Sequence, residues 1–403
     1  MINMKKAIMM ALSLVGITIA NGQTINSLGT MVFNDEGVLF VGDNISGSIL
    51  AFDFKSEKQK KKGFEINVYN IDAQIASVLG TAQSSVQVND IAVHPKSGEV
   101  YLSVTRGHGL DALPALLKVT ADNHLIAIDL SQVSVTSQSL SKLPSIESKI
   151  GLRGTARSAP TPKEVAKSQR SLRNLAIVAL EYHNGELFVA GISNEEFCSV
   201  LRRMPYPFDG TESISNIEMY HIVHDSYETR APIRSMSVQT IDDKDHLVAA
   251  YTCSPLVLIP LEDLKDSAKV KAKTVGDMGN GQPIDMVPFK MKGEAMLFVT
   301  NNSRSPMVIP LKGLNGAKAV TKEDFTRGPK LDINPIMPYG PVGKPVMFSG
   351  ASLRIDLLND SHFISLNRDF ETGSLDLISL NSFVPFKLHN IVGQKDVPVQ
   401  KQK

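Results

Sequence analysis

A repeated pair of apolar segments constrains the fold of this chain more than any other feature. Six times, a short apolar run is followed by a polar turn and a second apolar run. The first runs are 38–41, 99–104, 186–190, 246–251, 295–300 and 362–366, and their partners are 48–54, 115–120, 198–204, 255–261, 306–311 and 374–380. A hairpin that returns every few tens of residues is typical of propellers and related arrays.

Each repeat contains further strand-like segments. An alternating or apolar run precedes each pair, at 30–33, 90–94, 176–182, 234–238, 285–289 and 353–358. Weaker candidates for an outer strand are 63–69, 215–223 and 269–273. Four antiparallel strands in each of six units predict an all-β fold, a six-bladed β-propeller. The alternative is seven blades, with the seventh in the Pro-rich stretch 326–347.

The repeat predicts one propeller domain over residues 23–390, although 403 residues would also suit two or three domains. Two insertions interrupt the repeat. Residues 72–79 predict a short helix with Asp72 as N-cap and Gly80 just past its end. Residues 134–173 form a polar insertion, predicted to be a mobile loop leading into one short helix near Thr161. Residues 391–403 are predicted to be a flexible tail.

The first 22 residues predict a secretory signal peptide. Lys5 and Lys6 precede an apolar run at 7–20, and small residues precede Gln23. This run is short for a bilayer span, so we expect a secreted or periplasmic protein without a transmembrane segment. A retained N-terminal anchor is the alternative. Export would permit a disulfide between Cys198 and Cys253, but two separate buried thiols are favoured.

The composition excludes some partners and supplies no catalytic signature. The formal net charge is +1, with 42 basic and 41 acidic residues. A balanced chain has no general attraction for nucleic acid or anionic lipid. The sequence lacks Gly-x-Ser-x-Gly, a Gly-rich phosphate loop, His-Glu-x-x-His and Cys-x-x-Cys. Whether the protein is an enzyme therefore stays open on the sequence alone.

Charged residues near the starts of four inner strands point to a binding site. The inner strands of a propeller line a central channel, and concave channel mouths are common ligand sites. Asp90, Arg234, Asp285 and Arg354 alternate in sign at equivalent positions. Neighbouring and loop candidates for ligand binding are Asn89, Arg106, His108, Glu196, His224, Glu228, Arg230, Asn301 and Arg304.

Three interpretations of these charges are open. The first is a polar pocket that binds an anionic or sugar-like ligand. The second is a divalent metal held by Asp90 and Asp285, together with Glu196. The third is that the Asp and Arg side chains neutralise one another and fix the register of the blades.

The segment His221-x-x-His224 with Glu228 also suggests a metal site. Residues three apart on a strand point to opposite faces. Only a turn beginning near His221 would bring both imidazoles together. We therefore expect one packed and one exposed histidine.

Residues 88–101 (VNDIAVHPKSGEVY) and 34–41 (NDEGVLFV) resemble the blade openings of NHL-type and SMP-30/gluconolactonase-type propellers. In the latter, acidic and Asn side chains around the channel hold a divalent metal that polarises a lactone or ester carbonyl. The resemblance implies Asp90, Asp285 and Asn301 as ligands of Ca²⁺ or Zn²⁺. This chain departs from that pattern at Arg234 and Arg354, which would repel a dication. Quinone-dependent propellers have Trp-docked blades, and this chain has no Trp.

The sequence favours an exported propeller that binds a partner protein or a small anionic ligand through its loop-rich channel face. One alternative is a metal-dependent hydrolase of lactonase or esterase type. Another is a docking subunit of a periplasmic redox assembly. The fold class alone does not decide among these functions.

Overall fold

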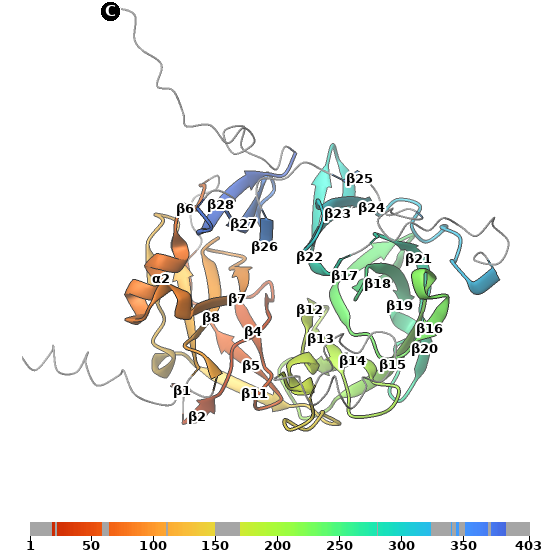
Figure 1. Cartoon of the computed structure of the whole chain (residues 1–403), viewed down its shortest axis with the longest axis horizontal. Coiled ribbons are helices and arrows are strands. Elements are labelled where there is room, and N and C mark those ends of the chain that lie inside the picture. The colour runs from red at the N-terminus through yellow and green to blue at the C-terminus, as the bar shows by residue number, and fades with distance from the viewer. Residues whose placement is uncertain are drawn as a thin grey trace, which may run out of the picture.

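Six antiparallel sheets are arranged in a ring in the computed structural model (Figure 1). The structure describes residues 18–20, 22–58, 64–109, 112–149, 170–279, 281–323, 340, 344–345, 351–369 and 372–383. Each sheet contains at least four strands, so the prediction of a six-bladed β-propeller is confirmed. We number the blades by the order of their inner strands along the chain.

In every blade, the strands follow one another from the centre of the ring outward. Blade 1 contains, in that order, β3 (Met31–Phe33), β4 (Val38–Asp43), β5 (Ser48–Asp53) and β11 (Val135–Ser139). Blade 2 contains β7 (Val86–Val93), β8 (Val100–Arg106), β9 (Leu113–Val119) and β10 (Leu125–Ala127). Blade 3 contains β12 (Ala179–His183), β13 (Glu186–Ile192), β14 (Ser199–Pro205), β15 (Ser213–His221) and β16 (Ser226–Glu228).

The remaining three blades follow the same pattern. Blade 4 contains β17 (Ile233–Ile241), β18 (Lys244–Tyr251), β19 (Pro255–Pro260) and β21 (Lys273–Asp277). Blade 5 contains β22 (Pro283–Met291), β23 (Glu294–Asn301), β24 (Met307–Pro310) and β25 (Lys344–Pro345). Blade 6 contains β26 (Ala351–Asn359), β27 (His362–Arg368), β28 (Leu375–Asn381) and β6 (Asn67–Val68). A small hairpin of β1 (Thr18–Ala20) and β2 (Gln23–Ile25) precedes blade 1.

The blades do not follow one another around the ring in chain order. The inner strand β3 lies between β7 and β12, and β26 lies between β7 and β22 (Figure 1). The order around the ring is therefore blades 2, 1, 3, 4, 5 and 6. Six apolar clusters of described residues match this order, since each joins one pair of neighbouring blades.

Two outer strands come from distant parts of the chain, and their pairing stabilises this order of the blades. β6 precedes blade 2 in sequence but pairs with β28 of blade 6, where the Ile66 N–H donates to Ser379 Oγ at 2.8 Å. β11 follows blade 2 in sequence but pairs with β5 of blade 1. Blade 6 thus joins a strand from the first part of the chain to three from the last, which closes the ring.

The second strand of each blade produced the strongest sequence signal because both its faces are covered. Every residue of β4 is buried, and so it appears as a continuous apolar run. The inner strands have one face on the channel, and their patterns are mixed; β7 is buried only toward its end. The burial pattern of the sheets therefore explains which repeats were conspicuous.

Some sequence predictions need correction. The predicted 63–69 strand contains β6, but it belongs to blade 6. Within 269–273, β20 (Lys269–Lys271) pairs in parallel with β15, and β21 is the outer strand of blade 4. The prediction of a loop across 134–173 is wrong for 135–139, which forms β11. The outer strand predicted at 215–223 is confirmed by β15.

The predicted helix is present as α2 (Ile71–Leu79), but its N-cap is Asn70. Asp72 lies in the first turn, where its carboxylate accepts hydrogen bonds from the Gln83 side chain and the Leu375 N–H. Gly80 ends the helix in the left-handed conformation, φ 62°, as predicted.

Other sequence predictions lie outside the described residues. They are most of the signal segment 1–22, the helix near Thr161, most of 326–347, and the tail. In the described ranges, no helix combines the length and apolar character that crossing a membrane requires.

Candidate functional site

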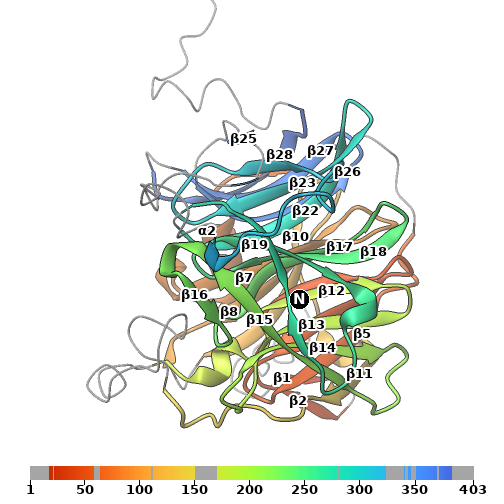
Figure 2. The ribbon, with the colours of Figure 1, turned by 90° about the vertical axis from the view of Figure 1, so that its right-hand side faces the viewer.

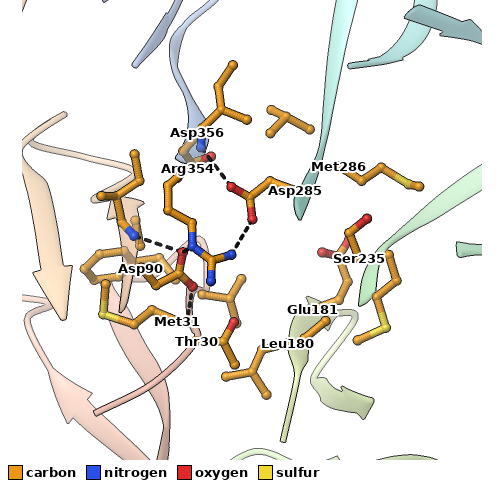
Figure 3. A pocket seen from close by; sticks show the side chains of 18 of the residues that line it. Thr30, Met31, Asp90, Leu180, Glu181, Ser235, Asp285, Met286, Arg354 and Asp356 are labelled. Atoms are coloured by element: carbon orange, nitrogen blue, oxygen red, sulfur yellow. Dashed lines mark hydrogen bonds and ion pairs between the residues drawn. The ribbon is translucent and has the colours of Figure 1, made fainter. Parts of the chain in front are cut away.

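The inner strands of all six blades surround a central cavity of about 240 Å³. Seven charged side chains line it: Asp35, Asp90, Glu181, Arg234, Asp285, Arg354 and Asp356. The four predicted from strand starts (Asp90, Arg234, Asp285 and Arg354) are therefore gathered in one place. Glu181 on β12 and Asp356 on β26 were missed (Figure 3), as was Asp35, an exposed residue of the turn between β3 and β4.

Arg354 is held between two carboxylates (Figure 3). Its Nη1 donates to Asp285 Oδ1 at 2.9 Å, and its Nε lies 3.5 Å from Asp90 Oδ1. The same Nε donates to the backbone oxygen of Asn89 at 2.8 Å. Arg354 therefore links blade 6 to blades 2 and 5.

The four carboxylates that lie on inner strands also connect neighbouring inner strands. An inner strand is the edge strand of its sheet. The N–H groups on its unpaired edge, which faces the channel, therefore need acceptors. Each carboxylate accepts such an N–H from the next blade. The pairs are Asp90 with Met31 at 2.7 Å, Asp356 with Val93 at 2.8 Å, Asp285 with Ile355 at 2.8 Å and Glu181 with Val238 at 3.0 Å. These contacts directly support the interpretation that the charged side chains fix the register of the blades.

Burial alters the protonation of three of these acids. Desolvation raises the pKa of Glu181 to about 7, against the opposing hydrogen bonds from Val238 and Ser237. It raises the pKa of Asp356 to about 7 and that of Asp285 to about 6. Near neutral pH the cavity is therefore less negative than five acids and two arginines would suggest.

Arg234 differs from Arg354 and from the four inner-strand acids of the cavity. Within the described part of the chain it makes no ion pair, and its buried Nε has no hydrogen-bond partner. Burial, and then the nearby Arg354 guanidinium, lower the pKa of Arg234. The Arg234 guanidinium is thus a cation that lines the cavity. No carboxylate among the described residues compensates its charge.

The other predicted site residues lie away from this cavity. None of Arg106, His108, Glu196, His224, Glu228, Arg230, Asn301 and Arg304 lines it. Asn89 is beside the cavity, but its side chain donates to Leu28 O and Thr105 Oγ1. His108 Nε2 is 3.1 Å from Ser84 O in a loop of blade 2.

A second cavity, also about 240 Å³, lies among the loops of blade 3. Glu196 and Arg230 line it, with Arg230 Nη2 3.8 Å from Glu196 Oε1. Cys198 lies there as a buried free thiol, and Cys253 is a second free thiol. The favoured prediction of two separate thiols agrees with this arrangement.

The proposed metal set of Asp90, Asp285 and Asn301 is not gathered at one point. Asn301 accepts from the Ser303 N–H at 2.9 Å and lies outside the cavity lining. Arg354 occupies the space between the two aspartates. Among the described residues, metal-ligand atoms converge at His221, His224 and Glu228 instead.

The two histidines of this cluster lie together, contrary to the expectation of one packed and one exposed ring. β15 ends at His221, and a 3-10 turn, Ile222–His224, follows at once. The ring centroids are 4.0 Å apart. The turn that the strand geometry demanded is therefore present, and sequence spacing alone could not show it.

Comparisons with known proteins identify no family. No family model matches the chain, and no curated protein matches it. An aldose sugar dehydrogenase from Streptomyces coelicolor, solved in its PQQ-bound form, is 12% identical over 90% of this chain and 96% of its own, with TM-score 0.29. A glucose dehydrogenase is 11% identical over 91% and 98%, with TM-score 0.35.

A third solved structure is a GH43 protein of a Bacteroides ovatus xyloglucan locus. It is 10% identical and covers 80% of this chain and 54% of its own, with TM-score 0.32. Similarity at these values carries no argument about activity. The strand topology defines the class as a six-bladed β-propeller, and the resemblance to NHL and SMP-30 propellers specifically gains no support.

Proposed function

We propose that this propeller binds a small anionic ligand in its central cavity, with Arg234 as the anchor. The supporting observation is the contrast among the charged groups there. Each of the four inner-strand carboxylates accepts a backbone N–H, and Arg354 is neutralised by Asp90 and Asp285. Of the two cavity arginines, only Arg234 is left to bind an anion, since its buried Nε has no hydrogen-bond partner among the described residues.

The cavity favours a hydroxylated carboxylate of the sugar-acid class. A guanidinium binds a carboxylate through two parallel hydrogen bonds, which gives both affinity and orientation. Glu181 and Asp356 supply carboxyl oxygens for hydroxyl groups on the same ligand. A cavity of about 240 Å³ suits a small ligand, since the pockets that bind drug-sized molecules have volumes of about 300 Å³ or more.

The other functions considered from the sequence have less support. A metal-dependent hydrolase in this cavity would need a cation where the Arg354 guanidinium already lies between Asp90 and Asp285. The partner-protein and redox-docking alternatives rest on the loop-rich face alone. We also propose export, on the basis of residues 1–22; an N-terminus at Gln23 in extracellular or periplasmic protein would test it.

Calorimetric titration with sodium D-glucuronate tests the proposed site. We expect wild type to bind glucuronate in preference to uncharged glucose. Arg234→Gln should weaken binding about tenfold or more, because a hydrogen bond to a charged group contributes roughly 1.5–3 kcal/mol. Arg106→Gln, which removes an arginine outside the cavity, should bind like wild type. Equal binding by wild type and Arg234→Gln would contradict the proposal, as would wild type that binds neither glucuronate, phosphate nor sulfate.

A further inference from the structure

A cluster of buried histidine and carboxylate groups lies at the boundary of blades 3 and 4, apart from the central cavity. His221 ends β15, His224 ends the turn that follows, and Glu228 ends β16. Asp277, the last residue of β21, reaches the cluster from blade 4. Figure 2 faces this side of the ring and shows β15 and β16 together.

The local sequence explains how the first three side chains meet. β15 and β16 form a hairpin in which Glu228 is opposite Met219 and His221 is opposite Ser226. His221 and Glu228 are therefore diagonal neighbours, close enough for side chains to interact. Asp225 takes the left-handed conformation, φ 46°, and its carboxylate accepts the Tyr220 hydroxyl at 2.8 Å. These contacts hold the turn that places His224 beside His221.

Three possible ligand atoms converge in this cluster. Glu228 Oε1 lies 3.1 Å from His221 Nδ1 and 2.5 Å from His224 Nδ1. One ligand atom from each of the three residues lies within 4.8 Å of the others. His221 is fully buried and Glu228 nearly so, whereas the His224 side chain is 16% exposed. The cluster is thus enclosed, with His224 on its accessible side.

Several polar atoms of the cluster are buried without a hydrogen-bond partner. They are His221 Nε2, Glu228 Oε2 and Asp277 Oδ2. His221 Nε2 and Asp277 Oδ2 lie 3.7 Å apart. Buried polar atoms are rarely left unpaired, because each one costs roughly 1–3 kcal/mol. Three in one cluster point to a group that completes it.

We propose that this cluster is a site for a divalent transition metal, with zinc as the ion that the donor set favours. His221 Nδ1, His224 Nδ1 and the Glu228 carboxylate are the ligands. Two imidazoles and one carboxylate are a common zinc donor set that leaves a coordination position for water. The proposal concerns a site separate from the central cavity and does not depend on the proposed ligand there.

Metal binding would account for the unpaired atoms together. A neutral imidazole that binds metal through Nδ1 carries its proton on Nε2, so His221 Nε2–H would face Asp277 Oδ2. A carboxylate in this position typically orients a ligating histidine. Glu228 Oε2 would be the second oxygen available to the metal. The metal-free alternative is a doubly protonated His221 between Glu228 and Asp277, and it leaves Glu228 Oε2 without a partner.

The site would link two blades. Its ligands belong to blade 3, whereas Asp277 belongs to blade 4. The same boundary is already bridged by the parallel pairing of β15 with β20. We therefore expect the metal to stabilise the contact between these blades.

Zinc uptake by the full chain tests the proposal. Chelator-treated protein is dialysed against micromolar zinc chloride, metal is counted by elemental analysis, and affinity and melting temperature are measured. We expect about one zinc per chain and a higher melting temperature with zinc. The zinc affinity of His224→Gln should be lower than that of wild type by about tenfold or more. Asp277→Asn should weaken it roughly tenfold to a hundredfold, as removal of an orienting carboxylate does elsewhere.

The matched control is His183→Gln. His183 Nε2 is 3.1 Å from Asp245 Oδ2, so it also pairs with a carboxylate, but outside the cluster. This variant should take up zinc like wild type. Folded wild type that takes up no zinc would overturn the proposal, as would equal uptake by His183→Gln and His224→Gln. If His224→Gln does not fold, the comparison of Asp277→Asn with His183→Gln decides in the same way.

Discussion

The two arginines of the central cavity lie on inner strands of the same ring, in blades 6 and 4, but in different surroundings. Arg354 contacts Asp90, Asp285 and the backbone oxygen of Asn89. Arg234 has a buried Nε without a partner and an Arg354 guanidinium nearby. The comparison separates two uses of charge. Paired groups hold the blades in register, whereas an uncompensated group is available to a ligand.

The same contrast distinguishes the cavity from the histidine cluster. In the cavity, each of the four inner-strand carboxylates accepts at least one backbone N–H. In the cluster, His221, Glu228 and Asp277 each keep a buried polar atom without a partner. Unpaired buried atoms therefore mark both places where we propose a ligand.

The largest expected effect on stability comes from Arg354→Met. This change leaves Asp90 and Asp285 without their countercharge in a partly buried site. We expect the free energy of unfolding to fall by on the order of 3 kcal/mol. Denaturant unfolding measures the change, and Arg106→Met is the control outside the cavity. A melting temperature within a degree of wild type would show that the Arg354 pairs do not hold the ring.

A smaller effect is expected at Glu181. Glu181→Leu removes the acceptor for the Val238 N–H and Ser237 hydroxyl, which should cost about 2 kcal/mol. Glu181→Gln keeps an acceptor oxygen and should cost clearly less. Unfolding curves of the two variants make the comparison. Equal losses would mean that charge or packing matters at this boundary, and not the hydrogen bond to the next blade.

The pH dependence of stability tests the raised acids. Burial raises the pKa of Glu181 from 4.5 to about 7 in the folded protein. Between these values the folded state binds more protons than the unfolded state, so stability falls as pH rises. Wild type should lose on the order of 2 kcal/mol more than Glu181→Gln between pH 5 and pH 8. Unfolding at a series of pH values checks this, and parallel curves would contradict it.

The sequence predicted the blades well because their central strands are covered on both faces. It also predicted Asp90, Arg234, Asp285 and Arg354, since all four lie on inner strands, although Asp90 lies in the second half of β7 and not at its start. Asp356 could have been found, because it lies two residues after Arg354 and shares its face of the strand. Glu181 offered no comparable signal, since it is the middle residue of the short strand β12 and not near the start of the predicted run 176–182.

The order of the blades could not be read from local pattern. It depends on β6 pairing with β28 and on β11 pairing with β5, and both outer strands are short or polar. Asn301 was proposed as a metal ligand by resemblance, but it ends β23 and lies outside the cavity lining. The histidine cluster needed the turn after β15 and a carboxylate from another blade. Contacts between distant segments set each of these features.

The free energy of unfolding of Arg234→Met, measured beside wild type without added anion, tests the central claim most directly. If Arg234 is an uncompensated cation kept for a ligand, its removal relieves desolvation and repulsion from Arg354. The account predicts stability equal to wild type or higher by up to about 1 kcal/mol. A loss on the order of 3 kcal/mol, like that expected for Arg354→Met, would contradict it and make both arginines structural.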